Sequence, residues 1–241
     1  TTTLIYEMLK SSGYKCWLGG NIGNPLLSDI ESISENDKVV LELSSFQLHS
    51  MKQSPNIAVI TNLSPNHLDV HKSMEEYILA KTNIFNYQDE NDVLVLNYDN
   101  EITKNLAVDA KSTVTFFSRT NILNKGVYVR DNYIYYNDTK VLWVNDIKLP
   151  GVHNIENYMA AISAVWGMVS VETINYVAKT FGGVQHRIEF VRELNNVKYY
   201  NDSIASSPTR AKAGLYSFDQ KLVLIAGGYD KKIPFDDFGY D

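Results

Sequence analysis

The hydrophobic and polar positions along the chain predict strands that alternate with helices. Apolar runs at residues 39–41 and 57–61 have the length of buried strands, and residues 45–53 between them are long enough for a crossover helix. Such a β-α-β unit would make the two strands parallel neighbours, with ligands bound at their carboxyl ends. Further strands are expected at 93–97 and 113–117, with a helix between them at 101–108.

The start of the chain has a helical pattern. Apolar residues recur at helical spacing from position 4 to position 9, and the pattern ends near Gly13. A short strand is expected at 14–18. The loop that follows, at 19–25, is so rich in glycine that we expect a turn in which backbones approach closely.

The period of the pattern changes in the second half of the chain. Short β-rich runs at 126–130, 133–137 and 141–145 are separated by polar pairs, which is typical of an antiparallel meander. Helices are then expected from residue 151 and at 171–181.

The glycine pair Gly182–Gly183 marks the expected domain boundary, which gives domains at 1–184 and 185–241. After it, strands at 188–193 and 197–200, a helix at 209–216 and an apolar strand at 221–226 would complete a second β-α-β unit.

Three residues are candidates for a metal site at the edge of the first sheet. Glu42 ends a buried run, where a lone carboxylate is costly and requires a cation. His67 lies in the polar loop that follows the next strand. Ser73 and Glu76 have the spacing of a capping box at the start of the helix that carries Lys81.

Lys81 is spaced with Tyr77, Ile78 and Ile84 so that it points in the direction of the core-facing side chains. The alternative is a lysine that snorkels to the surface, which is the commoner case for an arbitrary helix. Beside Glu42 and His67, however, Lys81 suggests an oxygen-rich Mg²⁺ site, provided that carbamylation gives the lysine carboxylate character.

Two other groups of polar residues have both a functional and a structural interpretation. Asn154 and Asn157 could present two amides on one helix face, although from spacing alone an N-cap role for Asn154 is slightly favoured. The glycine pair at 227–228, followed by Lys231 and Lys232, is equally consistent with an anion site and with surface lysines in a turn.

Composition fits a globular protein with a large core. The 241 residues are 44% hydrophobic and 21% charged, with a net charge of −6. Lysine and arginine form no basic stripe, so nucleic acid is not an expected partner, and no apolar run reaches membrane-spanning length. The single cysteine, Cys16, is expected in the core and fits a cytoplasmic protein. We expect a monomer.

Several motifs follow one another along the chain. They are Gly-Gly-Asn-Ile-Gly at 19–23, Leu-Glu-Leu-Ser-Ser-Phe-Gln-Leu at 41–48, Asn-His-Leu-Asp at 66–69 with Lys81, Gly-Val-His-Asn-Ile-Glu-Asn at 151–157, His186–Arg187, Asn-Asp-Ser at 201–203, and Gly227–Gly228 with Lys231. Taken in this order, the motifs resemble the Mur ligases, and within that family the members that add D-glutamate. The resemblance covers essentially the whole chain.

The resemblance implies an α/β fold. It consists of a mostly parallel, P-loop-type central sheet with helices on both faces and a small antiparallel meander, followed by the first part of a Rossmann-like α/β domain. It also implies an ATP-dependent ligase that adds D-glutamate to UDP-N-acetylmuramoyl-L-alanine through an acyl phosphate, in peptidoglycan biosynthesis.

The resemblance also implies roles for individual residues. Glu42 and His67 would hold Mg²⁺, and carbamylated Lys81 would support a second Mg²⁺. On the ATP side it implicates Thr1, Thr2, Asn154, Asn157, His186, Arg187 and Asp202. Asn21 would lie toward the muramoyl substrate, and Ser206 and Lys231 toward D-glutamate.

Some features depart from the family pattern or leave alternatives open. Ile204 stands where these ligases often have a lysine, and Lys232 competes with Lys231 for the glutamate role. A folylpolyglutamate-synthase-like ligase and a non-catalytic nucleotide-binding relative are the alternative functions. Because the family's phosphate-binding loop would precede Thr1, we expect a fragment that is inactive as a ligase on its own.

Overall fold

The structure is a computed structural model that describes residues 1–23, 25–64, 73–228 and 238. The chain divides into two compact units, which are described separately. The first contains residues 1–146 and 156–177, and the second contains residues 147–155 and 178–241. Helix α5 (Val152–Val165) contributes residues to both units.

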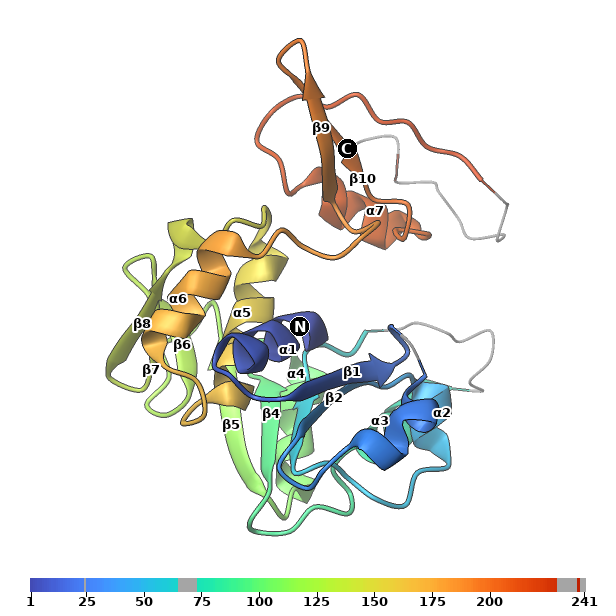
Figure 1. Ribbon diagram of the computed structural model, residues 1–241, viewed down its shortest axis with the longest axis vertical. Helices are drawn as coiled ribbons and strands as arrows, with labels where there is room; N and C mark the ends of the chain where they lie inside the picture. The colour runs from blue at the N-terminus through green and yellow to red at the C-terminus, as the bar shows by residue number, and fades with distance from the viewer. Residues whose placement is uncertain (24, 65–72, 229–237, 239–241) are drawn as a thin grey trace. The chain divides into compact units, whose positions relative to one another are not determined.

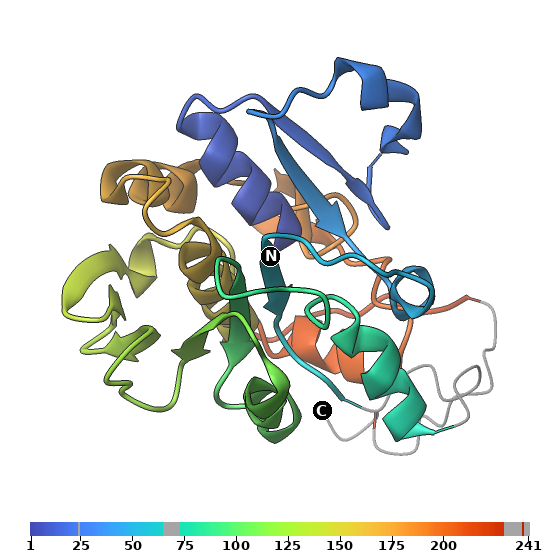
Figure 2. The same ribbon diagram turned by 90° about the horizontal axis from the view of Figure 1, so that it is seen from below.

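A six-stranded sheet forms the centre of the first unit (Figures 1 and 2). Its strands, in spatial and chain order, are β3 (Ile57–Ile60), β4 (Val93–Asn97), β5 (Thr113–Ser118), β6 (Val127–Arg130), β7 (Tyr133–Tyr136) and β8 (Thr139–Trp143). The pairs from β3 to β6 are parallel, and β6, β7 and β8 pair antiparallel. The predicted α/β fold, with its parallel sheet and antiparallel meander, is confirmed.

The strands β1 (Cys16–Gly20) and β2 (Lys38–Glu42) form a separate parallel pair. The prediction that residues 39–41 and 57–61 form neighbouring strands is therefore wrong, because β2 pairs with β1 and β3 pairs with β4. The prediction that residues 39–41 form a buried strand also fails in part. Val39 and Leu41 are each 45% exposed, while Val40, on the other face of β2, is buried.

Helices flank these strands. Helix α1 (Thr2–Ser11) contacts β1 and β2, and α2 (Ser45–His49) contacts α3 (Met74–Thr82), as Figure 1 also shows. The other elements of this unit are α4 (Glu101–Asn105) and the 3₁₀ helices η1 (Leu26–Ser32), η2 (Leu106–Asp109) and η3 (Val144–Asp146). Helix α6 (Val171–Thr180) belongs to this unit up to Val177, and its last three residues belong to the second unit.

Local side-chain hydrogen bonds start several of these helices where the sequence places polar residues. The Ser73 hydroxyl accepts a hydrogen bond from the Glu76 N–H at the start of α3. At the start of α2, Ser44 and Gln47 form a complete capping box. Among the helices in the described part of the chain, none is both long and apolar enough to cross a membrane.

Buried apolar residues from strands and helices form the core of the first unit. Ala58, Leu94 and Leu96 of the parallel strands pack with Tyr77 and Phe85, and all five are buried. The predicted apolar side of α3 therefore faces this core. Cys16, in contrast, is only half-buried at the start of β1, so the prediction that it is a core residue is wrong.

In the second unit, β9 (Glu189–Leu194) and β10 (Val197–Asn201) form an antiparallel hairpin followed by α7 (Pro208–Leu215). Asn195 and Asn196 make the turn with positive φ angles, which asparagine tolerates well. The strand predicted at 221–226 is not formed. Within the described residues it has no partner strand, and Val223 and Ile225 are 94% and 93% exposed.

Candidate active site

Glu42 and Asn21 are fixed next to each other by the ends of β1 and β2. Glu42 pairs with Gly20, and the Asn21 N–H donates a hydrogen bond to the Glu42 carbonyl at 2.6 Å. Gly20 has a φ of 92°, and a Cβ there would lie 2.1 Å from the Glu42 carbonyl oxygen. Only glycine fits this close approach, so the glycine-rich loop determines where Glu42 lies.

Lys81 extends from α3 toward the end of β2. Its Nζ lies 3.5 Å from the Leu43 carbonyl oxygen and 5.8 Å from the centroid of the Tyr77 ring. Burial lowers the pKa of Lys81 below the usual lysine value, and the nearby Glu42 carboxylate offsets part of that shift. The structure therefore brings Lys81 and Glu42 together, as the sequence pattern suggested.

His67 and Lys231, the other predicted members of these sites, lie outside the described residues, as does Lys232. Among the described residues, no group of three or more histidine, cysteine, aspartate or glutamate side chains has the arrangement of a metal site. Of the three residues predicted to hold metal, Glu42 and Lys81 lie within the described part of the chain. The Glu42 carboxylate is a donor of the type that Mg²⁺ prefers.

Thr1 and Asn157 are in direct contact although 156 positions separate them in the sequence. Thr1 is the N-cap residue of α1, and its hydroxyl donates a hydrogen bond to Asn157 Oδ1 on α5. Thr2 is the first residue of α1. The Thr1 hydroxyl and the Asn157 amide therefore lie side by side. Both residues were predicted to lie on the ATP side.

Asn154 lies in the first turn of α5, and its amide donates a hydrogen bond to the Pro150 carbonyl at 2.6 Å. The helix begins at Val152, so the interpretation of Asn154 as an N-cap is wrong. Its amide instead ties this turn to the segment before the helix.

His186 and Asp202 lie close together in the second unit. The Asn201 side-chain amide is 2.8 Å from His186 Nδ1, and the Ile188 N–H donates to Asp202 Oδ1 at 3.1 Å. Asp202 also approaches α7 closely, because a Cβ on Gly214 would lie 2.6 Å from Asp202 Oδ2. The segment before β9 is therefore held against the end of β10.

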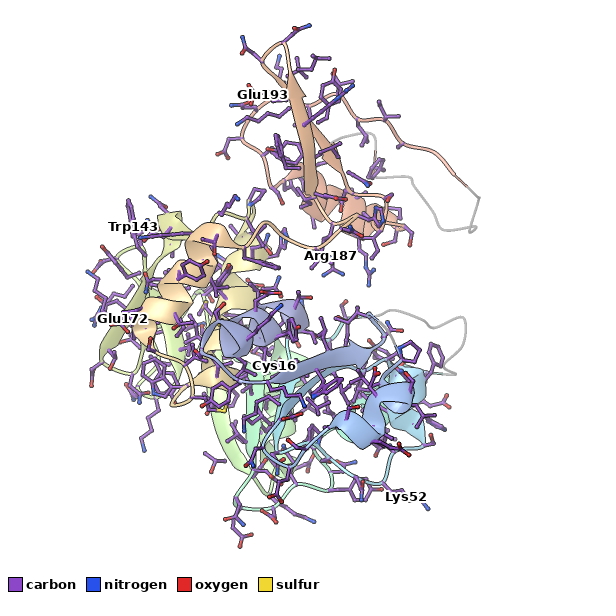
Figure 3. The ribbon with its side chains drawn as sticks, viewed as in Figure 1. Cys16, Lys52, Trp143, Glu172, Arg187 and Glu193 are labelled. Carbon is purple, nitrogen blue, oxygen red and sulfur yellow. The ribbon has the colours of Figure 1, made fainter. Side chains whose placement is uncertain are left out.

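Arg187 and Ser206 are exposed residues of the same unit. Figure 3 shows Arg187 at the opposite end of the hairpin from Glu193, which lies near the turn between β9 and β10. The Ser206 N–H donates to the Ile204 carbonyl at 2.9 Å, in the loop before α7. Both side chains are accessible to a ligand.

Sequence reasoning missed a polar cluster at the carboxyl ends of β4 and β5. Asp99, which follows β4, accepts hydrogen bonds from the segment that follows β5, and Arg119 in that segment pairs with Glu156 at 2.9 Å. The available signal was the run Asn97–Asn100, since polar residues directly after a buried parallel strand mark the edge where ligands bind.

Comparison with known proteins identifies relatives of the chain. Residues 1–165 match the Mur ligase middle domain family. The UDP-N-acetylmuramoylalanine--D-glutamate ligase of Acetivibrio thermocellus is 63% identical over 243 residues, which cover 99% of this chain and 52% of that protein. The ligase of the same name from Clostridium kluyveri is 57% identical over 236 residues, which cover 98% of this chain and 52% of that protein.

Solved structures share the fold at low sequence identity. MurF from Acinetobacter baumannii superposes with a TM-score of 0.70 and 17% identity, over 92% of this chain and 52% of that one. The MurF ligase of Thermotoga maritima in complex with ADP has a TM-score of 0.67 and 17% identity, over 90% of this chain and 54% of that one.

The chain thus spans about half the length of the curated relatives it matches. The family match covers more than half of the chain itself, and it includes both β-sheets of the first unit. These 241 residues belong to the Mur ligase family.

Proposed function

We propose that these residues are part of an ATP-dependent ligase that joins D-glutamate to UDP-N-acetylmuramoyl-L-alanine in peptidoglycan synthesis. The observation that carries the proposal is the 63% identity, over nearly the whole chain, to a UDP-N-acetylmuramoylalanine--D-glutamate ligase. Because the chain spans about half of that relative, the proposed activity is that of a full-length protein that contains this chain, and we expect the chain alone to be inactive.

In the proposed reaction, the alanine carboxylate of the muramoyl substrate attacks the γ-phosphorus of ATP, and ADP leaves. The amine of D-glutamate then attacks the acyl carbon of the acyl phosphate. The bond between the acyl carbon and the bridging oxygen breaks, a proton is lost from nitrogen, and inorganic phosphate leaves with that oxygen, which came from the carboxylate, so that an amide bond remains. These steps require positioned substrates and neutralised charge more than covalent catalysis.

Glu42 and Lys81 support a metal role at the end of β2. Glu42, with His67, would hold Mg²⁺, which neutralises phosphate charge when it is bound. The lowered pKa of Lys81 increases the share of neutral amine, the form that reacts with carbon dioxide to give a carbamate. Carbamylated Lys81 would then be an anionic oxygen ligand for a second Mg²⁺.

The remaining predicted residues would bind the organic substrates. By the family resemblance, the residues that would bind ATP are Thr1, Thr2, Asn154, Asn157, His186, Arg187 and Asp202. Asn21 would bind the muramoyl substrate, and Ser206 and Lys231 would bind D-glutamate.

The domain organisation, oligomeric state and cellular role are also proposed by analogy with the family. Residues 1–184 would be the ATPase domain, and residues 185–241 the first part of a domain that binds the incoming amino acid. The protein would be a cytoplasmic monomer, and its product would be needed for cell shape and division.

The proposal is tested by measuring phosphate release in a full-length protein that contains this chain. We expect release to require ATP, Mg²⁺, UDP-N-acetylmuramoyl-L-alanine and D-glutamate together. Glu42→Gln keeps the side-chain shape and removes the charge, so it is expected to lower kcat by about 100-fold or more. Glu35→Gln, at an exposed carboxylate before β2, is the matched control and is expected to have no effect.

Either of two results would refute the proposal. One is phosphate release that does not depend on D-glutamate. The other is glutamate addition to a folate in place of the muramoyl substrate, which would favour the folylpolyglutamate-synthase-like alternative. If Glu42→Gln turned over normally across a Mg²⁺ titration, the metal role of Glu42 would be wrong.

A further inference from the structure

Arg119 and Glu156 form a charge-assisted contact between the sheet and helix α5 of the first unit. Arg119 Nε donates to Glu156 Oε1 at 2.9 Å. Both side chains are about one-third exposed, so the pair is partly shielded from water and its geometry is that of a direct hydrogen bond. Such a pair is expected to have more influence than a fully solvated surface pair.

Asp99 fixes the backbone that carries Arg119. Its carboxylate accepts hydrogen bonds from the Arg119 N–H at 2.7 Å, the Thr120 N–H at 3.2 Å and the Thr120 hydroxyl at 2.6 Å. The Ser118 hydroxyl and the Asn121 amide also donate to Asp99. Arg119 is therefore attached to a segment that is rigidly joined to the end of β4.

The end of β4 is in turn tied to the end of β3. The Asn100 amide donates to Asn62 Oδ1 at 2.7 Å and to the Leu63 carbonyl at 3.1 Å. The Asn97 carbonyl accepts a hydrogen bond from the Thr103 hydroxyl at 2.6 Å. The carboxyl ends of β3, β4 and β5 thus form one hydrogen-bonded network, and Arg119 projects from it.

On the other side of the ion pair, Glu156 directly precedes Asn157 on α5. Asn157 Oδ1 accepts the hydrogen bond from the Thr1 hydroxyl at the start of α1. A movement of α5 relative to the sheet would therefore displace Asn157 and its contact with Thr1, the residues that we place on the ATP side.

We infer that the Arg119–Glu156 pair positions Asn157 for nucleotide binding by holding this part of α5 at the carboxyl edge of the sheet. The inference rests on the proposed function, because it assumes that Asn157 meets the nucleotide. Arg119 and Glu156 are positioning residues. Losing the pair weakens nucleotide binding and leaves the chemical step intact.

A double-mutant cycle tests this inference in a full-length protein that contains this chain. The variants are Arg119→Gln, Glu156→Gln and the double variant, with ADP affinity measured by calorimetry. We expect each single variant to weaken ADP binding by about tenfold. The double variant should also weaken ADP binding by no more than about tenfold, because either change alone already removes the same interaction.

The control pair is Glu101 and Lys104 on α4, whose charged atoms are 3.9 Å apart and in which the Glu101 side chain is 81% exposed. Glu101→Gln and Lys104→Gln are expected to leave ADP affinity unchanged. Steady-state kinetics provide a second readout. In the Glu156→Gln variant, KM for ATP should rise while kcat and KM for D-glutamate remain within about twofold of the parent values.

Arg119→Lys and Glu156→Asp keep the charges and serve if the glutamine variants do not fold. They are expected to weaken ADP binding less than the glutamine variants would. The inference would be overturned if Glu156→Gln left ADP affinity unchanged. It would also be overturned if Arg119→Lys and Glu156→Asp both left ADP affinity unchanged. A hundredfold loss in the double glutamine variant, or a parallel loss of kcat, both KM values and thermal stability, would also overturn it.

ADP binding is measured without amide synthesis, so the two proposals can fail separately. If the parent protein binds ADP but shows no D-glutamate-dependent turnover, the proposed function is refuted. The double-mutant cycle on ADP affinity would then still test the positioning role of Arg119 and Glu156. A parent protein that does not bind ADP would overturn both.

Discussion

Asp99 shows how a single carboxylate can organise a sheet edge and make its stability depend on pH. Burial alone would raise the pKa of Asp99, but hydrogen bonds from Ser118, Thr120, Asn121 and the Arg119 N–H outweigh it and lower the pKa below its usual value. Such a group stabilises the fold above its unfolded pKa of about 3.9, and this contribution is lost as the pH falls through the folded value.

We therefore expect Asp99→Asn to lower the free energy of unfolding by about 1 to 2 kcal/mol near neutral pH. This value is at the lower end of the range for hydrogen bonds to charged groups, because solvent screens the charge of a partly exposed carboxylate. The difference from the parent should shrink as the pH falls below about 3.9. Urea unfolding across this pH range is the measurement, with Asp109→Asn at an exposed position as control. A difference that stayed constant with pH would contradict this explanation.

Residues whose position follows from a local pattern could be predicted from the sequence. Glu42 at a strand end and Lys81 on an apolar helix stripe are such cases, and the structure places them near each other. The Arg119–Glu156 pair could not be predicted in the same way. Its partners come from segments far apart in the sequence, and neither hydrophobic spacing nor a turn motif indicates that the two meet.

At the scale of elements, the β1–β2 pair depends on a glycine that no other residue can replace. A side chain at Gly20 would meet the Glu42 carbonyl oxygen, and its φ of 92° adds backbone strain. Gly20→Ala is expected to lower the free energy of unfolding by about 3 kcal/mol or more, because the strands must separate to make room.

Gly13→Ala provides a matched control for that change. Gly13 has a nearly equal φ of 89°, but no atom lies within 4 Å of the added Cβ. Its cost should be about 1 to 2 kcal/mol, the cost of the left-handed backbone alone. Equal losses in the two variants, measured by urea unfolding, would show that the close approach to Glu42 is unimportant.

Individual elements were easier to predict than their pairing. The strand predicted at 93–97 is β4 with the same bounds, because a buried strand of a parallel sheet is a short, continuous apolar run. The pairing of residues 39–41 with 57–61 failed because strand order depends on contacts between distant segments. Residues 221–226 have a strand-like composition, but a strand also needs a partner with which to form hydrogen bonds.

At the scale of the whole molecule, the sequence indicated the class of fold, a mostly parallel sheet with helices and an antiparallel meander. The change from parallel strands to a meander was visible because antiparallel hairpins leave short apolar runs separated by turn residues. The exact division of residues was not visible. Residues 147–155 belong to the second unit because of their tertiary contacts. The amino-acid composition of this segment does not indicate to which unit it belongs.

The order of strands in the six-stranded sheet has a consequence for how the chain folds. Strands β6, β7 and β8 are joined by tight turns, and the first of these, at Asp131 and Asn132, already has the positive φ angles of a hairpin. Strands β3, β4 and β5 are joined through helices, so their pairing must close much longer loops and proceeds more slowly.

We therefore expect the meander to gain amide protection before the parallel strands. Hairpins form within about 1–10 μs, whereas the parallel strands must wait for distant segments to meet. Pulsed hydrogen exchange during refolding, read by mass spectrometry of peptides from 127–143 and 57–97, would measure the order. Earlier protection of the β3–β4 pair would show that the parallel core, and not the hairpins, nucleates the fold. If the meander does form first, β6 offers a preformed edge onto which β5 and then the rest of the sheet can add.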